Sequence, residues 1–449
     1  MKIEVTDYII KNLGKKSFLN IIIGIDYPNG KYANTKAVID FSNLGYFKGR
    51  IPAVSLNFLY FSAIVYAIDR AVKREKHSID GWSREFEVAF KLPDSGMFTD
   101  NQIEIESLLS YLTGDFWQCT FLQCEDFQLT INEDRDIFDD VSQVNLFSGG
   151  MDSLIGAIDF FASNIEGKVF LSSHYDSNMG GPKSDQQRLL HEFEEKYRNR
   201  YVLYEDNNPI LIKTEITEDT TCRSRSLMFI ALALQVAVYT NSKIVVPENG
   251  SVSLNFPLSV SRRASCSTRT THPVILYKLQ NLFCNFGLSV SLENPYELMT
   301  KGEMVTQCKN RDFLLQVLPL SNSCGKRGRR QYFVDNPLAT HCGRCMPCMY
   351  RKAALVGFND TTTYGITMNS LYKHKKQKIS DDFFAMLNFL KKDLSDEDIY
   401  KELNIAGLGR FEQLPYYVEL VKRTRLELKN LVVNEGNESI LNYLNIAYD

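Results

Sequence analysis

The sequence predicts an α/β protein built around a parallel sheet, and three observations lead to that fold class. Strand-like apolar runs alternate with helical patterns over residues 141–360, which is typical of a parallel sheet covered by helices on both faces. Residues 1–138 combine short strand patterns with an apolar helix, and residues 361–449 have helical periodicity. The chain of 449 residues is also longer than one hydrophobic core usually grows. We therefore expect an N-terminal mixed α/β domain, a central parallel-sheet domain and a helical C-terminal region.

In the N-terminal domain, the expected strands are FLNIIIGID and REFEVAFKL. Helices are expected over residues 54–72 and near residues 103–112. The most apolar stretch of the first helix, residues 54–67, is too short to span a bilayer and contains Asn57 and Ser62, so a buried helix is expected there. The acidic residues 132–140 are expected to form a solvated junction between domains, because a run of carboxylates lacks an ordered metal-ligand spacing.

In the central domain, the expected strands are VNLFS, KVFLSSHYD, PILIKTEI and SKIVVPENG, with a long helix at RSLMFIALALQVAVYTN. In open sheets of this kind, ligands bind beyond the carboxyl ends of the strands. Residues 148–153, 174–177 and 248–250 follow three of these strands. The sequence therefore predicts a single crevice lined by these three segments.

The C-terminal region contains three segments with helical periodicity. They are DDFFAMLNFLKKDL, DEDIYKELN and YYVELVKRTRLELKNLVV. We expect them to form a helical tail attached to the central domain.

Composition restricts the class of partner. The chain has 51 basic and 54 acidic residues, for a net charge of −3, so binding to nucleic acid through bulk charge is not expected. The N-terminus shows no apolar signal-peptide segment, which predicts a soluble cytoplasmic protein without a membrane partner. In that compartment the ten cysteines are expected to be thiols or metal ligands rather than disulfides.

The stretch SGGMDS, residues 148–153, lies at an expected turn between a strand and a helix. It is neither a P-loop nor a dinucleotide-binding fingerprint. Its backbone N–H groups, its two serine hydroxyls and the following helix N-terminus together favour an anion site. Asp152 fits such a site if Mg²⁺ bridges it to phosphate oxygens, or if it caps the helix. A Gly-Gly turn capped by serine and aspartate, with no ligand, is the alternative.

A second constellation is CGRCMPC, in which Cys342, Cys345 and Cys348 follow Cys324. Four thiolates are a complete tetrahedral ligand set for Zn²⁺, so we expect a small zinc-binding element. Buried reduced thiols are the alternative, and an iron–sulfur cluster is disfavoured because no cysteine follows Cys348. His341 is a fallback zinc ligand. The basic segment GKRGRR between the cysteines is expected either to contact phosphate or an acidic partner, or to be solvated.

SGGMDS after an apolar strand resembles the signature of the PP-loop ATP pyrophosphatases. With the cysteine motif, residues 142–358 resemble the 7-cyano-7-deazaguanine synthase (QueC) family. RSRSLMFIALALQVA is similar to that family's Arg-Asn-x-x-Phe helix, with Arg225, Ser226 and Phe229 at the matching positions, and NPYELMTKGEMV supplies Lys301 as the matching lysine. The resemblance implies a sheet of the adenine nucleotide alpha hydrolase-like (HUP) type, with ATP and Mg²⁺ as cofactors.

The resemblance also implies roles for particular residues. Asp152, Lys301 and Arg225 are the expected catalytic residues, and Zn²⁺ is the expected metal of the four cysteines. ATP is expected to contact the turn and the end of the second strand, at Ser148, Gly149, Gly150, Met151, Asp152, Ser153 and Ser173.

The sequence departs from the family in three places. Serine replaces asparagine at Ser226, the segment 174–188 is longer than expected, and residues 247–273 replace a glycine-led acidic loop. With the extra N-terminal region, these features resemble most the QueC-like proteins of Qat-type anti-phage defence operons. The resemblance implies adenylation of a 7-deazaguanine carboxylate, followed by amide formation on the N-terminus of a partner protein from the same operon. STRTTHP is expected either to shape the acceptor pocket or to be a structured turn.

Other functions remain open at this point. The first is nitrile synthesis with ammonia, the ordinary reaction of the family. A tRNA-thiolating PP-loop enzyme would need a reactive thiol near the loop, for which Cys222 and Cys266 are candidates. A non-catalytic adaptor with a degenerate nucleotide fold is the third alternative.

Overall fold

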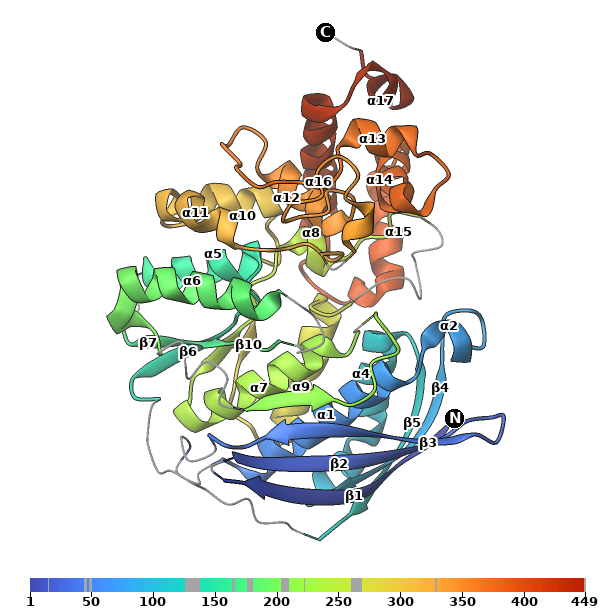
Figure 1. The fold of residues 1–449 in the computed structure, drawn as a ribbon, viewed down its shortest axis with the longest axis vertical. Coiled ribbons are helices and arrows are strands. Elements are labelled where there is room, and N and C mark those ends of the chain that lie inside the picture. The colour runs from blue at the N-terminus through green and yellow to red at the C-terminus, as the bar shows by residue number, and fades with distance from the viewer. Residues whose placement is uncertain are drawn as a thin grey trace.

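The computed structural model describes residues 1–14, 16–43, 47, 51–125, 138–163, 166–175, 181–202, 210–221, 223–259, 269–327 and 329–447. Two sheets lie on opposite sides of a helical layer, and further helices cover the smaller sheet (Figure 1). The strands are β1 Lys2–Leu13, β2 Lys16–Asp26, β3 Tyr32–Asp40, β4 Glu85–Leu92, β5 Phe116–Gln123, β6 Val141–Leu146, β7 Lys168–Ser172, β8 Leu211–Thr214, β9 Lys243–Val245 and β10 Leu292–Glu293.

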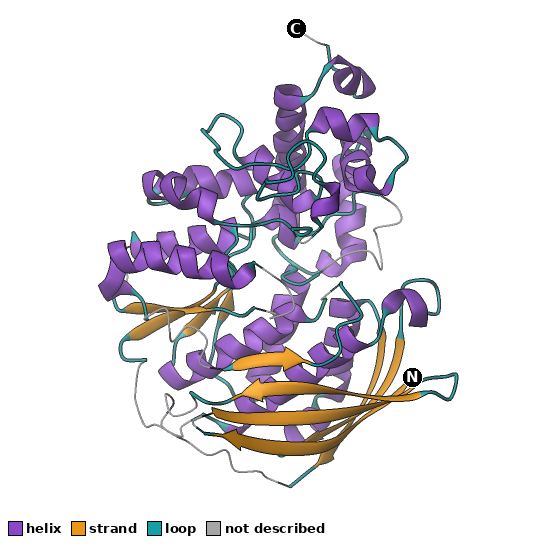
Figure 2. Ribbon diagram, viewed as in Figure 1, coloured by secondary structure: helices purple, strands orange, loops and turns teal. Residues whose placement is uncertain are grey.

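The helices occur throughout the chain and form nearly all of its C-terminal part (Figure 2). They are α1 Ala53–Ala71, α2 Arg74–His77, α3 Gly96–Asp100, α4 Gln102–Thr113, α5 Met151–Phe161, α6 Pro182–Tyr197, α7 Arg225–Thr240, α8 Gly250–Ser253, α9 Pro273–Asn285, α10 Lys301–Gln307, α11 Arg311–Val317, α12 Met346–Ala354, α13 Met368–Lys373, α14 Asp381–Lys391, α15 Asp396–Leu403, α16 Leu414–Glu435 and α17 Glu438–Tyr443. The expected helices α1, α4, α7, α14, α15 and α16 are confirmed. No helix within the described ranges combines the length and the apolar character needed to cross a membrane.

The smaller sheet is parallel throughout, in the order β10-β9-β6-β7. This confirms the predicted parallel sheet and three of its four expected strands. The prediction is wrong for the fourth expected strand, PILIKTEI, because β8 pairs antiparallel with β3 in the larger sheet. Of the four residues of β8 only Ile212 is buried, whereas strands buried on both faces of a parallel sheet are continuously apolar.

The larger sheet has six strands in the order β5-β4-β1-β2-β3-β8. β1, β2 and β3 form an antiparallel meander, while β4 and β5 run parallel to β1. The expected strands FLNIIIGID and REFEVAFKL correspond to β2 and β4 and are confirmed. Because β8 completes this sheet from the middle of the chain, the N-terminal residues are not a self-contained sheet.

One hydrophobic core lies between the two sheets. α1 packs on β3 and on α7, and α7 in turn packs on β6 and β9. α7 is apolar around its whole circumference, which is the pattern of a helix that is buried on every side. Buried residues of this core come from β2, α1, β6 and α7, including Ile21, Phe58, Val144 and Ala233. The core therefore crosses the boundary expected near residue 140.

A second core covers the other face of the parallel sheet, through α5, α6, α10 and α11. The C-terminal helices α14, α15 and α16 form a third core with α12. α16 also contacts α8, where Thr424 and Ser251 form a hydrogen bond of 2.6 Å. The C-terminal helices thus reach the elements that follow the strands of the parallel sheet.

A buried ion-pair network joins the N-terminal region to the start of α7. Asp69 on α1 accepts hydrogen bonds from the Arg84 guanidinium at 2.6 Å and from the backbone N–H of Ser224 at 3.0 Å. Asp115 accepts from Arg84 at 2.7 Å and from Arg74 at 2.9 Å. All five residues are buried. Removing one side of such a network typically costs about 3–5 kcal/mol, because it leaves buried charge uncompensated.

We therefore expect a chain that lacks residues 1–138 to be insoluble or unfolded. The deletion removes the five strands that form the larger sheet with β8, uncovers the face of α7 that packs on α1, and leaves Ser224 without Asp69. Soluble yield and the circular dichroism spectrum measure the effect.

Co-expression of fragments 1–138 and 139–449 is the control. Because the two parts meet through noncovalent contacts, the fragments should associate and restore soluble protein. A truncated chain that is soluble and melts cooperatively by itself would contradict the shared core.

Candidate functional site

The SGGMDS stretch forms a turn at the carboxyl edge of the parallel sheet. β6 ends at Leu146 and α5 begins at Met151, so the predicted strand-turn-helix arrangement is confirmed. Gly149 has a φ of +83°, which favours glycine, and a Cβ there would lie 3.3 Å from Gln186 on α6. We call residues 147–150, which connect β6 to α5, the glycine loop.

Two serine hydroxyls hold the glycine loop. The Ser148 Oγ accepts from the Gly150 N–H at 3.3 Å and lies 3.3 Å from the Ser153 Oγ. The Ser153 hydroxyl donates to the Gly150 carbonyl at 3.0 Å. Ser148 is exposed, whereas Ser153 is buried. The loop thus presents one hydroxyl and the N-terminus of an eleven-residue helix at the sheet edge, an arrangement that can bind an anion.

The carboxylate of Asp152 lies in the first turn of α5 and is buried. The Lys301 ammonium donates to one carboxylate oxygen, and the Asn249 side chain donates to the other at 2.6 Å. Lys301 is the first residue of α10 and only 4% exposed. A capping box between Thr300 and Glu303 fixes the start of that helix. The structure therefore brings together two of the three expected catalytic residues as a buried ion pair.

Glu248 adds a second carboxyl group to this ion pair. It follows β9 and shares a hydrogen bond with Asp152. Burial raises the pKa of Glu248 well above its usual value, and the adjacent charge of Asp152 raises it further. Burial opposes ionisation of Asp152 too, but Lys301 and the hydrogen bonds hold its pKa below the usual value. These opposite directions favour a proton on Glu248 rather than on Asp152, which remains the partner of the Lys301 side chain.

Arg225, the third expected catalytic residue, is the first residue of α7. Its guanidinium lies 5.2 Å from the centre of the Phe229 ring, and its Nε is buried without a hydrogen-bond partner in the described part of the chain. Phe229 packs on His174, which follows β7, at 5.5 Å between ring centres. This places Arg225 toward the same edge of the sheet. Within the described residues, no hydrogen bond or ion pair connects it to Asp152 or Lys301.

The other expected nucleotide contact is Ser173, which is buried just after β7 and donates its hydroxyl to the Leu171 carbonyl at 3.2 Å. Cys222, Cys266 and most of residues 132–140 lie outside the described residues, as does the middle of the segment 174–188. The structure therefore gives no position for the two thiols considered for sulfur transfer.

The described part of STRTTHP is a structured turn. His272 is the N-cap of α9: its Nδ1 accepts from the Val274 N–H at 3.2 Å and lies 3.0 Å from the Tyr111 hydroxyl. Burial, together with the charge of Arg269, lowers the pKa of His272 to about 3. A neutral imidazole is required for this capping role. His272 and Arg269 line a pocket together with Phe256 and Ile405.

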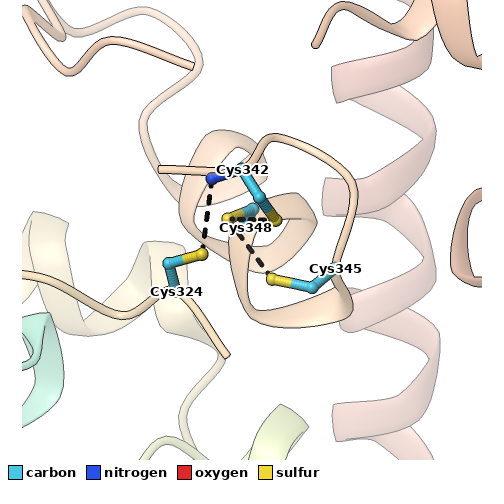
Figure 3. A group of neighbouring side chains, drawn as sticks. All are labelled: Cys324, Cys342, Cys345 and Cys348. Atoms are coloured by element: carbon cyan, nitrogen blue, oxygen red, sulfur yellow. Dashed lines mark hydrogen bonds between the residues drawn. The ribbon is translucent and has the colours of Figure 1, made fainter. Parts of the chain in front are cut away.

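The four cysteines converge on one point, as the spacing predicts (Figure 3). Their sulfur atoms all lie within 4.8 Å of one another, with 3.8 Å between Cys342 and Cys348 and 3.4 Å between Cys345 and Cys348. Sulfur atoms of a tetrahedral site with Zn–S bonds of about 2.3 Å are about 3.8 Å apart. Hydrogen bonds from the neighbouring thiols, that of Cys324 first, lower the pKa of Cys342 and so favour a thiolate. The cluster can bind a metal ion such as zinc.

His341, the fallback ligand, is not part of the four-sulfur cluster in the described residues. Its Nδ1 lies 2.9 Å from the Thr340 hydroxyl, its ring packs on Tyr364, and burial lowers its pKa to about 3. Two residues of the basic segment form ion pairs within the protein: Arg327 pairs with Asp185 on α6, and Lys326 pairs with Asp382 at 2.8 Å.

The site includes residues that the sequence did not single out. Asn249 holds Asp152, Glu427 on α16 accepts from the Thr300 hydroxyl, and Ser323 accepts from the Met151 N–H at 3.2 Å. Asn249 lies in a segment predicted to line the crevice, but no sequence pattern distinguishes Ser323 or Glu427. Both act across long sequence separations that local periodicity does not report.

The chain matches no protein-family model, no curated protein and no solved structure. Its fold and its residues define an α/β protein with a parallel sheet, a glycine loop at the carboxyl edge of that sheet, and a four-cysteine cluster that can bind a metal ion.

Proposed function

We propose that this protein is an ATP-dependent ligase of the PP-loop type, which adenylates a 7-deazaguanine carboxylate and passes the acyl group to an amine. The observation that carries the proposal is the contact of Lys301 with Asp152 directly behind the glycine loop. These residues are 149 positions apart, and both lie in segments that resemble motifs of the QueC family. The parallel sheet and the cysteine cluster, at the expected distance along the chain, support the same proposal.

The proposed reaction has two steps. A carboxylate oxygen of the substrate attacks the α-phosphorus of ATP, so that the acyl adenylate forms and pyrophosphate leaves. An amine nitrogen then attacks the acyl carbon, and the products are an amide, AMP and a proton. The N–H groups of the glycine loop and the Ser148 hydroxyl hold the leaving pyrophosphate, and Lys301 contributes positive charge where negative charge develops. Arg225 contributes a second cation from α7.

Two carboxyl groups in this cluster suit a magnesium ion. Carboxylate oxygens are preferred Mg²⁺ ligands, and Asp152 and Glu248 lie side by side next to the glycine loop. They would hold Mg²⁺ once the shared proton leaves, and the ion would neutralise phosphate charge. Zn²⁺ is the metal that we propose for the four cysteines, where it has a structural role because all four ligands come from the protein.

We propose the N-terminus of a partner protein as the acceptor amine. An amine that is docked beside the acyl adenylate has an effective concentration on the order of 10⁵ M or more, which dissolved ammonia cannot match. The strands of residues 1–138 lie outside residues 142–358, the part of the chain that resembles the QueC family. This addition supports a macromolecular acceptor, as does the segment 247–273, which replaces the family's acidic loop.

Incubation of the full-length protein with ATP, 7-carboxy-7-deazaguanine and a co-expressed operon partner should give a covalently modified partner polypeptide. Intact-mass spectrometry should show the partner heavier by one deazaguanine acyl group, with free nitrile as a minor product. A partner with an acetylated N-terminus is the matched control and should remain unmodified.

Efficient nitrile formation from ammonia without a change in partner mass would contradict the proposed acceptor. It would leave the adenylation proposal in place. ATP consumption that yields neither product in the presence of the carboxylate would contradict the proposed substrate.

A further inference from the structure

Residues 321–324, which we call the bridging segment, connect the four-cysteine cluster to the glycine loop. The Asn322 N–H donates to the Gly149 carbonyl at 2.9 Å, and the Met151 N–H donates to the Ser323 Oγ at 3.2 Å. The next residue along the chain is Cys324, a member of the cluster. Two hydrogen bonds therefore join the glycine loop to residues that directly precede Cys324 in the chain.

The side chain of Asn322 ties both cysteine-bearing loops together. Its Oδ1 accepts from the Cys324 N–H at 2.9 Å, and its Nδ2 donates to the Thr340 carbonyl at 3.3 Å. Thr340 precedes Cys342 by two residues, and the Cys342 N–H donates to the Cys324 Sγ at 3.3 Å. The side chain of this half-buried asparagine thus contacts both chain segments that carry the cysteines. Its backbone N–H contacts the glycine loop.

A second connection passes through α12, the helix that carries Cys348. Arg351 lies one turn further along this helix and is fully buried. Its guanidinium donates to the Ser321 Oγ at 2.9 Å and to the Leu318 carbonyl at 2.9 Å. Hence the bridging segment is held at one end by Arg351 and at the other by Cys324.

The glycine loop lies within van der Waals contact of the bridging segment at Gly150. A Cβ built on Gly150 would lie 3.7 Å from the Asn322 carbonyl oxygen and 3.7 Å from the Ser323 Oγ. An anion site made of backbone N–H groups depends on the relative orientation of successive peptide units. A movement of the bridging segment would therefore change the direction in which the N–H groups of the loop point.

We propose that Asn322 and Ser323 are positioning residues that make the conformation of the glycine loop depend on metal bound at the four cysteines. With the metal in place, four bonds to sulfur fix Cys324 and the bridging segment. Without it, hydrogen bonds alone hold the cysteine loops and the bridging segment, so the glycine loop is supported less firmly. The consequence for nucleotide binding rests on the proposed function, whereas the coupling between metal and loop does not.

Hydrogen–deuterium exchange of the peptide spanning residues 147–153 tests the coupling in the full-length protein. Removal of the metal with a chelator should accelerate exchange in this peptide about fivefold or more, since a hydrogen bond contributes roughly a factor of that size. Asn322→Ala and Ser323→Ala should accelerate it by similar factors while metal analysis shows that the metal is retained. Ser323→Thr keeps the hydroxyl and should exchange like the wild type.

Asn336→Ala is the matched control. Asn336 lies between the cysteines and accepts from the Leu338 N–H, with no hydrogen bond to the glycine loop among the described contacts. This variant should leave exchange of the loop unchanged. Equal exchange of the peptide with and without metal, in a protein that remains folded, would overturn the proposal.

The same samples separate this proposal from the proposed function. Saturating ATP should protect the loop peptide in the metal-loaded wild type and protect it less in Ser323→Ala. If metal removal accelerates exchange and ATP gives no protection, the coupling stands and the ATP assignment falls. If ATP protects the loop but metal removal leaves loop exchange in the ATP-free protein unchanged, the ATP assignment stands and the coupling falls.

Discussion

Asp152→Asn should reduce the conversion of ATP to AMP and pyrophosphate at least about 100-fold, the typical effect of removing a preorganised charge at a reacting centre. Asp152 is buried behind the glycine loop and is contacted by Lys301, Asn249 and Glu248. An amide in its place can neither bind a magnesium ion strongly nor hold the ammonium in position. Release of AMP and pyrophosphate from ATP, followed by chromatography, measures the effect.

Burial also makes this substitution costly for stability. An exposed Asp152 could be replaced without loss of packing, but this residue is only 7% exposed. A lone Lys301 would be left as a buried unpaired charge, at a cost of about 3–5 kcal/mol in the free energy of unfolding. Loss of activity in the single variant therefore has two explanations, unfolding or loss of chemistry.

The double variant Asp152→Asn with Lys301→Met distinguishes unfolding from loss of chemistry. Both charges are absent, so the free energy of unfolding should return toward that of the wild type, while turnover stays at the level of the single variant. Asp159→Asn is a control on the same helix: this carboxylate accepts from the Tyr296 hydroxyl at 2.8 Å, away from the loop, and turnover should persist. Turnover of the double variant within about tenfold of the wild type would contradict the PP-loop assignment.

Long periodic segments of this fold were predictable from the sequence. α1, α4 and α16 show apolar periodicity over several turns, and β2 and β4 are rich in apolar residues. β10 has only two residues and follows a helix, so it leaves no measurable pattern. The sheet to which β8 belongs was not predictable either, because a four-residue strand specifies its partner through tertiary packing rather than through its own sequence.

For the candidate site, predictability depended on whether a residue belongs to a local motif. The glycine loop and the four cysteines have motifs, so their positions followed from spacing. Lys301 came from the resemblance alone, and only the fold brings it to Asp152. Ser323 has no motif, since its role is one hydroxyl that accepts from an N–H group 172 residues earlier in the chain. Contacts of that kind depend on the packing of the whole chain.

Cys345→Ser should reduce the metal content of the purified protein from about one ion per chain to near zero, because a structural site needs its complete ligand set. Cys345 is buried directly before α12, and its sulfur lies 3.4 Å from that of Cys348. Metal binding contributes directly to the free energy of folding. The melting temperature of the variant should therefore fall to that of chelator-treated wild-type protein, and chelator should have no further effect on the variant.

Cys284→Ser is the control for this substitution, since Cys284 is an exposed thiol on α9, outside the cluster. It should keep the metal and the wild-type melting temperature. If the four cysteines were only buried thiols, serine at position 345 would change the volume little and chelator would not affect the wild type. Elemental analysis of freshly purified protein that shows no metal would contradict a metal site, and iron in place of zinc would contradict the zinc assignment. Zinc at one equivalent, lost in Cys345→Ser and retained in Cys284→Ser, would establish that the cluster is a structural metal site on which the folded state depends.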